Sequence, residues 1–343
     1  MLLMMTNSLE LNASPVRVWG DISSVYRSRD FDRGESQVTE WLNLASINAS
    51  SYIWQPWFAL INGGLTYSVD DFNASDQPSV KDKFITGNIQ FDLFPGSRFP
   101  FSAYVNRSRN ELDDDLFARD ISNTELGLTQ QYRSLSGRHH YRTTYKRNVL
   151  DDSSIGNFIS DSLQLSSSNQ FENQVLHAEA QYDRVSSEIA GDEAISLALT
   201  GRQSYDGFEY INIENLVSSS SIHNDFDTRS SEIQTNQFSS LMSWSPAGRD
   251  DMNFTASLRL LKLQFNSEFD DNSFSANTAT QQENYSLNIN QGLNYSISDH
   301  VLISESINGL YTRSQTQDFF TGNETVGISY TPASIDTILG YYH

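Results

Sequence analysis

The stretch NYSLNINQGLNYSIS, residues 284–298, shows a two-residue periodicity that recurs along this chain. Every second residue from Tyr285 gives Tyr, Leu, Ile, Gln, Leu, Tyr and Ile, and the residues between them are Asn, Ser, Asn, Asn, Gly, Asn and Ser. Successive side chains of a β-strand point to opposite faces of the sheet. The stretch is therefore predicted to be one long strand with an apolar face and a small, polar face.

Similar alternation fills much of the chain, and helical periodicity is almost missing. Helix start and stop signals do not occur in sensible pairs. The sequence therefore predicts an all-β protein. The clearest further examples of alternation are residues 57–69, 84–94, 125–132, 175–182, 194–205 and 300–311.

Composition excludes several classes of protein. The 343 residues include no cysteine, which excludes disulfides, thiolate metal sites and cysteine nucleophiles. The net charge of −21 disfavours nucleic acid as a partner, because nucleic-acid binding needs a basic surface. Mean hydropathy is −0.47 and no run of about 18 apolar residues occurs, so no membrane-spanning helix is expected. The N-terminal MLLMMTNSLE does not resemble a signal peptide, so either export is absent or the chain begins downstream of the true start.

The connections between the predicted strands alternate in length. Short breaks fall near 53–56, 95–98, 134–138, 189–193, 245–250, 298–300 and 331–334. Longer polar, acidic loops are predicted near 28–37, 70–82, 108–122, 149–170, 206–229, 267–282 and 313–323. Short turns on one side and long loops on the other are typical of an up-and-down antiparallel β-barrel that crosses a bacterial outer membrane.

Aromatic residues agree with a membrane-spanning strand. Tyr285 and Tyr295 are ten positions apart, about 34 Å along a strand. A tilt of roughly 40° reduces this to about 26 Å along the membrane normal, close to the height of the apolar band between two aromatic girdles. The residues predicted to form these girdles are Trp57, Tyr67, Tyr205, Trp244, Tyr285, Tyr295, Tyr311 and Tyr330.

A soluble two-sheet protein or a β-solenoid is the alternative to a membrane barrel. Its connections would not alternate between short and long. Its strands would also be nearer five or six residues, whereas many here reach about ten or more. The sequence therefore favours a transmembrane barrel in the outer membrane of a Gram-negative bacterium.

About 15–16 strands are predicted, and they divide the chain into two parts. Residues 15–343 are expected to form the barrel, incomplete at its C-terminus, and residues 1–14 an N-terminal segment or partial strand. The apolar set Met252 to Leu260 changes phase to Leu261, Leu263 and Phe265. Such a slip requires a β-bulge near Leu260 and Leu261, or a strand whose outer end protrudes beyond the lipid.

Two segments carry a resemblance to a known group of proteins. They are SSYIWQPWFALINGGLTYSV, residues 50–69, and NIQFDLFPGSRFPFSAYVNRSRNE, residues 88–111. Both resemble poorly characterised, porin-like outer-membrane β-barrel proteins of Gram-negative bacteria, in the proline-containing turns and the Asn-Arg-Ser strand end. The resemblance implies a barrel fold and an outer-membrane location, and it implies no catalytic residue or substrate.

Basic residues form the candidate functional site. Alternation places Tyr141, Thr143 and Tyr145 toward lipid, so the intervening basic residues should face the barrel interior. One interpretation is a basic stripe that selects anions or an acidic polymer. The other is that these residues pair with Asp92, Glu125, Glu179 and Asp183 to stiffen the wall. The predicted stripe comprises Arg133, Arg138, His140, Arg142, Lys146, Arg202, Arg259 and Lys262.

No cofactor, metal site or catalytic set is predicted. His139 and His140 are adjacent on a strand and cannot chelate one ion together, because their side chains point to opposite faces of the sheet. The acidic loops lack an EF-hand pattern, and no Gly-x-Ser-x-Gly sequence is present. Two hypotheses for function remain. One is a porin-like or export conduit with a polar, partly basic lumen and acidic external loops. The other is a non-conducting scaffold or adhesin that binds a periplasmic or surface protein, or a surface polysaccharide. In either case the expected partners include outer-membrane lipid and lipopolysaccharide.

Overall fold

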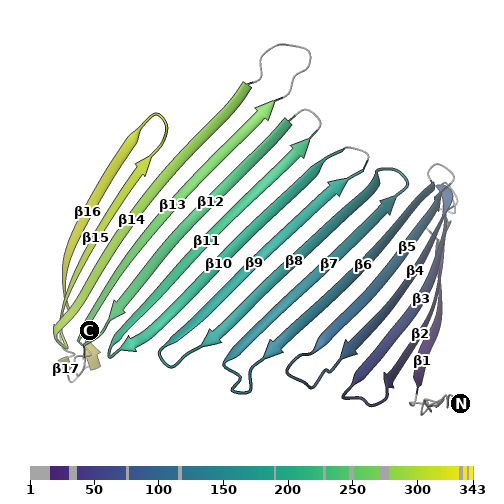
Figure 1. Cartoon of the computed structure of the whole chain (residues 1–343), viewed down its shortest axis with the longest axis horizontal. Helices are drawn as coiled ribbons and strands as arrows, with labels where there is room; N and C mark the ends of the chain where they lie inside the picture. The colour runs from purple at the N-terminus through teal and green to yellow at the C-terminus, as the bar shows by residue number, and fades with distance from the viewer. Residues whose placement is uncertain are drawn as a thin grey trace, which may run out of the picture. The chain divides into compact units, whose positions relative to one another are not determined.

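The computed structural model describes residues 16–30, 37–74, 77–114, 118–188, 191–226, 229–246, 251–269, 278–331, 335–337 and 340–342. The predicted segment 1–14 lies outside these residues. The chain is all-β: sixteen strands hydrogen-bond in one antiparallel sheet whose order follows the chain from β1 to β16 (Figure 1). The strand number predicted from the sequence is thus confirmed, and so is the up-and-down order. No helix in the described residues is long and apolar enough to cross a membrane.

The strands are long, from 13 to 21 residues. Their bounds are β1 Arg17–Asp30, β2 Gln37–Ile53, β3 Ala59–Ala74, β4 Gln77–Leu93, β5 Phe101–Asp114, β6 Ala118–Arg133, β7 His139–Asp152, β8 Gly156–Gln170, β9 Gln174–Ser187, β10 Glu193–Phe208, β11 Ile211–Phe226, β12 Arg229–Trp244, β13 Met252–Phe269, β14 Thr278–Ser298, β15 Val301–Arg313 and β16 Asp318–Tyr330, followed by a separate hairpin of β17 Ile335–Thr337 and β18 Gly340–Tyr342.

By contacts the chain divides into two compact units, which share the middle strands. One contains residues 1–135, 141–164 and 183–193, and the other residues 136–140, 165–182 and 194–343. In both units we call the edge with the even-to-odd connections, such as 54–58 and 299–300, the proximal edge. The edge with the odd-to-even connections, such as 153–155 and 314–317, is the distal edge.

In the first unit, the strand register separates two faces. Gly63, Ile89, Val105 and Leu126 lie opposite one another on β3 to β6. The neighbouring row, one residue along each strand, is Asn48, Gly64, Asn88, Asn106 and Glu125 on β2 to β6. The predicted two-faced character of these segments is therefore confirmed, and we call the two sides the apolar face and the polar face.

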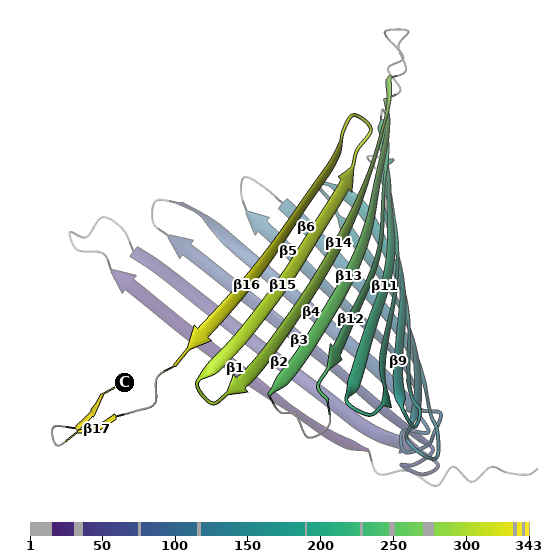
Figure 2. The same ribbon diagram turned by 90° about the vertical axis from the view of Figure 1, so that its left-hand side faces the viewer.

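In the second unit, β11 to β16 follow one another as neighbouring strands (Figure 2). Their register makes the same separation. Leu258, Ile289 and Gly309 share one row, and Ser257, Asn290 and Asn308 share the next. The stretch 284–298 forms most of β14 and keeps its tyrosines on the apolar face, as the sequence predicts.

Hydrophobic side chains are exposed rather than packed into a core. Among the described residues, Ala59 is the one buried hydrophobic residue. Ile89 is 63% exposed, Leu65 51% and Ile328 74%, all on the apolar face. A sheet that leaves one continuous face of this kind uncovered needs an apolar environment against that face.

The predicted alternation of short and long loops is wrong. The segments 149–170 and 206–229, predicted as long loops, contain β8 and β11, and the turn near 189–193 lies on the distal edge. The described residues of the other predicted loops likewise lie largely in strands, among them 70–74 in β3, 108–114 in β5 and 278–282 in β14. The reason is that backbone hydrogen bonds between strands do not depend on apolar side chains, so the sheet extends beyond the point where the apolar alternation fades.

The predicted β-bulge in β13 is absent. The register runs without interruption from Met252 opposite Tyr295 to Phe269 opposite Thr278. Leu261 and Leu263 therefore lie on the polar face, and the side chain of Lys262 projects from the apolar face. This outcome corresponds to the second possibility, a strand that continues past the apolar band.

Candidate functional site

The candidate site is a hollow on the polar face of the second unit, between β10 and β15. Its volume is about 870 Å³. Small side chains leave this space open, since Ser239, Ser257 and Ser286 occupy three adjacent strands. Charged, amide and aliphatic side chains surround them: Arg202, Glu214, Leu216, Leu241, Arg259, Leu261, Asn288, Asn290 and Leu310.

Two of the predicted basic residues meet at this hollow, and their charges are differently compensated. Arg202 Nη2 donates to Glu214 Oε2 at 3.0 Å, an exposed ion pair across β10 and β11. Arg259 Nη2 donates to Oε1 of the neutral Gln237 at 3.3 Å, and the described residues supply no carboxylate partner for it. Arg259 therefore presents an uncompensated positive charge to the hollow.

Asparagine side chains on β14 are held in place beside Arg259. Asn290 Nδ2 donates to Ser257 Oγ at 3.1 Å and to Asn288 Oδ1 at 2.5 Å. Asn288 lies opposite Arg259 in the register. These bonds orient a row of donors and acceptors at one wall of the hollow.

Leucines on the polar face were not predicted. Leu216 and Leu310 lie in the same row as Arg259, on β11 and β15, with Ser239 and Asn288 between them. Leu261 follows Arg259 by two residues on the same face. Sequence alternation assigned Asn, Ser and Gly to the lumen face. The phase change at Leu261 was the available sign that leucines also lie on that face. Because the register is unbroken, Leu261 joins Leu216 and Leu310 in an apolar surface, the leucine floor of the hollow.

Lys262 is a correction to the predicted basic stripe. Because β13 has no bulge, Lys262 lies opposite Tyr285 on the apolar face, near the distal limit of the apolar band. Its Nζ lies 2.7 Å from Glu283 Oε1 and 5.4 Å from the centroid of the Tyr285 ring. Lys262 therefore does not share a face with Arg259.

The other predicted basic residues occupy several positions. Arg133 ends β6 on the polar face and donates from Nη2 to Gln131 Oε1 at 3.1 Å. Arg138 lies in the turn before β7, where its carbonyl accepts the backbone N–H of Gln170 at 2.8 Å. On β7, His140, Arg142 and Lys146 alternate with Tyr141, which stacks with Tyr132 of the apolar face at 5.9 Å. The side chains of these three residues therefore project from the polar face. Their role as a stripe remains a proposal.

The predicted girdle residues on paired strands share the apolar face. The register places these residues on the apolar face: Tyr67, Trp244, Tyr285, Tyr295, Tyr311 and Tyr330. Tyr205, on β10, packs against Phe208 with ring centroids 5.5 Å apart. Trp57 lies in the β2–β3 turn beside Trp54 and Phe58, at the proximal edge. The aromatic cluster thus marks one end of the apolar band.

Ion pairs mark the other end of the band. On the apolar face, Lys83 Nζ lies 3.4 Å from Glu111 Oε1, and Arg109 Nη2 lies 2.6 Å from Asp120 Oδ2. Both pairs are near the distal edge. In β13 the apolar run that begins at Met252 ends at Leu260, two residues before Lys262 on the same face. Roughly 9–11 residues are what a tilted strand needs to cross a bilayer.

A tyrosine and a glycine stack on the polar face of the first unit. Tyr104 lies directly opposite Gly127, and its hydroxyl donates to Glu125. A Cβ at position 127 would lie 2.2 Å from Tyr104 Cε1. The ring therefore occupies the space that a side chain at position 127 would need.

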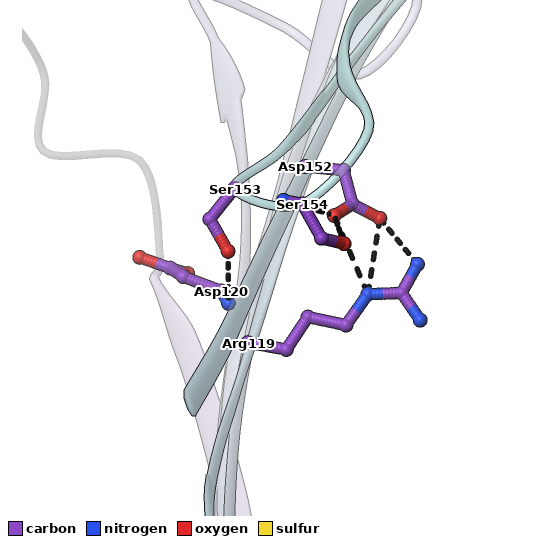
Figure 3. A network of polar contacts seen from close by, with 5 residues as sticks. All are labelled: Arg119, Asp120, Asp152, Ser153 and Ser154. Atoms are coloured by element: carbon purple, nitrogen blue, oxygen red, sulfur yellow. Dashed lines mark hydrogen bonds and ion pairs between the residues drawn. The ribbon is translucent and has the colours of Figure 1, made fainter. Parts of the chain in front are cut away.

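A buried carboxylate organises the β7–β8 turn at the distal edge (Figure 3). Asp152 is 3% exposed, and its Oδ2 accepts Arg119 Nη2 at 2.5 Å. Its Oδ1 accepts the backbone N–H of Ser154 at 2.9 Å and the Ser154 hydroxyl at 2.6 Å. Ser153 Oγ accepts the backbone N–H of Asp120 at 3.0 Å. Asp152 is the fourteenth residue of β7 and lies beyond the apolar band.

The hydrogen bonds from Arg119 and then Ser154 hold the pKa of Asp152 well below its ordinary value of 3.8. A lowered pKa in the folded state means that ionised Asp152 stabilises the turn above the ordinary value. The contribution should be lost as pH falls from there through the lowered pKa. We expect the protection factor of the Ser154 amide against hydrogen exchange, which is corrected for the intrinsic pH dependence of exchange, to fall over that pH range. In Asp152→Asn the protection factor should be lower at neutral pH and should change less with pH. An equal response in both proteins would contradict the assignment.

Within the described residues, no group of three or more His, Asp or Glu side chains is arranged to hold a metal ion. No protein-family model matches the chain, and no curated protein matches it.

Among solved structures, the chain is similar to several bacterial proteins at low identity. The copper transporter OprC is 10% identical, with 94% of this chain and 66% of that chain covered and a TM-score of 0.35. The siderophore receptor PirA from Pseudomonas aeruginosa is 8% identical, with coverage of 92% and 74% and a TM-score of 0.39. A BenF-like porin from Pseudomonas fluorescens is 10% identical, with coverage of 93% and 98% and a TM-score of 0.29. This chain thus spans just under two thirds of OprC.

Proposed function

We propose that this chain is a transmembrane β-barrel of the Gram-negative outer membrane and that its polar face lines an aqueous conduit. The single observation that carries the proposal is the uncovered apolar face. Large aliphatic and aromatic side chains are exposed across it, while the opposite face is rich in Asn, Ser, Thr and Gly and also carries charged residues and some leucines. In water such a face would associate or aggregate, whereas hydrocarbon covers it at no cost.

The limits of the apolar face support a membrane location. The Trp54, Trp57 and Phe58 cluster at the proximal edge has the character of an interfacial aromatic belt. At the distal edge the strands continue as hairpins with ion-paired side chains on both faces. We assign the distal edge, where polar, ion-paired strand ends extend beyond the apolar band, to the cell exterior and the aromatic proximal edge to the periplasmic side.

The polar face supports a water-filled interior. Its glycines and small polar side chains, such as Gly64 between Asn48 and Asn88, leave little bulk to fill a lumen. Arg259 adds a positive charge without a carboxylate partner, which favours anions over cations. The conduit is therefore proposed to pass small, preferentially anionic solutes without catalysing a reaction.

Planar-bilayer recording of the purified protein tests this function. We expect discrete conductance steps. In a salt gradient the reversal potential should shift toward the equilibrium potential of the anion. Arg259→Gln should reduce the anion preference, because it removes an uncompensated charge from the polar face. Insertion into the bilayer without conductance would contradict the conduit.

A non-conducting scaffold is the second candidate. It is favoured by the distal hairpins, whose ion pairs such as Arg119–Asp152 and Arg184–Glu193 would stiffen an external platform for a partner protein or polysaccharide. The same recording separates the two functions. A scaffold would insert without conductance and would retain a surface partner that is lost when the distal hairpin at residues 153–155 is replaced.

A further inference from the structure

We propose that the polar-face hollow of β10 to β15 is a binding site for small monocarboxylates that carry an apolar tail. This inference deepens the proposed conduit and rests on it for the access of a solute to the hollow. Its basis is a combination within one hollow: the guanidinium of Arg259, which has no carboxylate partner among the described residues, lies beside Leu216, Leu241, Leu261 and Leu310.

The anion would bind at Arg259. Its Nη2 already donates to Gln237, a neutral amide, and its other N–H groups can take a carboxylate side-on. Arg202 is less suited because Glu214 neutralises it at 3.0 Å. Asn288 lies opposite Arg259 and supplies an amide next to the same position. The site would therefore accept one negative charge.

The apolar tail would lie against the leucines. Leu241 is 46% exposed although its row contains the polar Glu214, Ser257 and Asn290. Leu216 and Leu310 flank Arg259 in its own row, and Leu261 lies two residues further along β13. Each methylene of a solute that leaves water against such side chains adds to the affinity. A hydroxylated chain would gain none of this.

Dimensions and polarity fit a small solute better than a polymer or a lipid. A hollow of about 870 Å³ is within the range of small-molecule pockets, roughly 300–1,000 Å³. Such pockets are mostly apolar, with a few polar groups that set orientation. The leucine floor and the Arg259 and Asn288 pair match that description.

Binding of hexanoate to the folded protein in detergent micelles tests the inference. Calorimetry or broadening of the hexanoate NMR signals would report Kd, with protein-free micelles as the blank. Gluconate has the same charge on a hydroxylated chain, hexan-1-ol the same tail without charge, and hexylammonium the opposite charge. We expect hexanoate to bind at least about tenfold more tightly than each of the three.

Four variants identify the groups responsible. Arg259→Gln and Leu261→Asn should each weaken hexanoate binding about tenfold. Arg259→Lys should retain most of the preference for hexanoate over hexan-1-ol. Arg27→Gln is the matched control, because Arg27 is also on the polar face but lies in the first unit, paired with Glu40 at 3.3 Å. It should leave the Kd unchanged.

The outcomes separate this site from the proposed conduit. Equal Kd values for hexanoate and gluconate, or no effect of Leu261→Asn, would overturn the site even if the protein conducts. Hexanoate binding that depends on Arg259 and Leu261, without conductance in bilayers, would support the site and remove the conduit. Circular dichroism of each variant confirms the β-sheet, so that a loss of binding reports the side chain that was changed.

Discussion

Ile89→Arg is expected to destabilise the membrane-inserted protein by about 2–4 kcal/mol, the cost of a cation near the middle of a bilayer on the lipid face of a barrel. Ile89 is 63% exposed on the apolar face, between Gly63 and Val105 in the register. No carboxylate shares that row in the described strands β3 to β6, so the guanidinium would have no partner. Equilibrium unfolding with urea or guanidinium chloride in lipid vesicles would measure the change.

Asn88→Arg is the matched control. Asn88 precedes Ile89 on β4, and its side chain projects from the polar face beside Gly64 and Asn106. An arginine there would be in water if the polar face lines a lumen, and the expected change is within about 0.5 kcal/mol. Similar losses of unfolding free energy for the two variants would mean that the two faces do not differ in environment. That result would contradict the membrane assignment.

Gly127→Ala is expected to cost about 1–3 kcal/mol, the range for overpacking a tightly fitted position. A Cβ would lie 2.2 Å from Tyr104 Cε1, so the tyrosine ring must move and its hydrogen bond to Glu125 would break. Unfolding in the same vesicles would measure the loss. Gly201→Ala is the control, because a Cβ there meets nothing within 4 Å.

Removal of the tyrosine ring distinguishes a steric cause from a backbone effect. In Tyr104→Ala the space beside position 127 is open, so adding Gly127→Ala should have little further effect. The coupling between the two substitutions should therefore approach the cost of Gly127→Ala alone. Additive losses would show that the glycine is required for its backbone and that the ring contact contributes little.

The sequence by itself determined the fold class and the two faces. Strand side chains alternate with a fixed period of two, so the pattern in residues 284–298 assigned Tyr285 and Leu287 to one face and Asn288 and Asn290 to the other before any pairing was known. The register confirms that assignment on β14 and on the strands of the first unit. Local alternation was sufficient because it reflects the solvent on each side of a single-layer sheet.

Only the tertiary structure decided where the strands end and how their rows align. β8 and β11 run through segments predicted as loops, because backbone hydrogen bonds to neighbouring strands hold polar sequence in the sheet. Pairing of β13 with both neighbours without a bulge put Lys262 on the apolar face and Leu261 beside Arg259 on the polar face. Glu214, Leu216 and Leu310 join them from distant parts of the chain. Such a grouping depends on cross-strand register, which is a property of paired strands and is absent from the periodicity of any one segment.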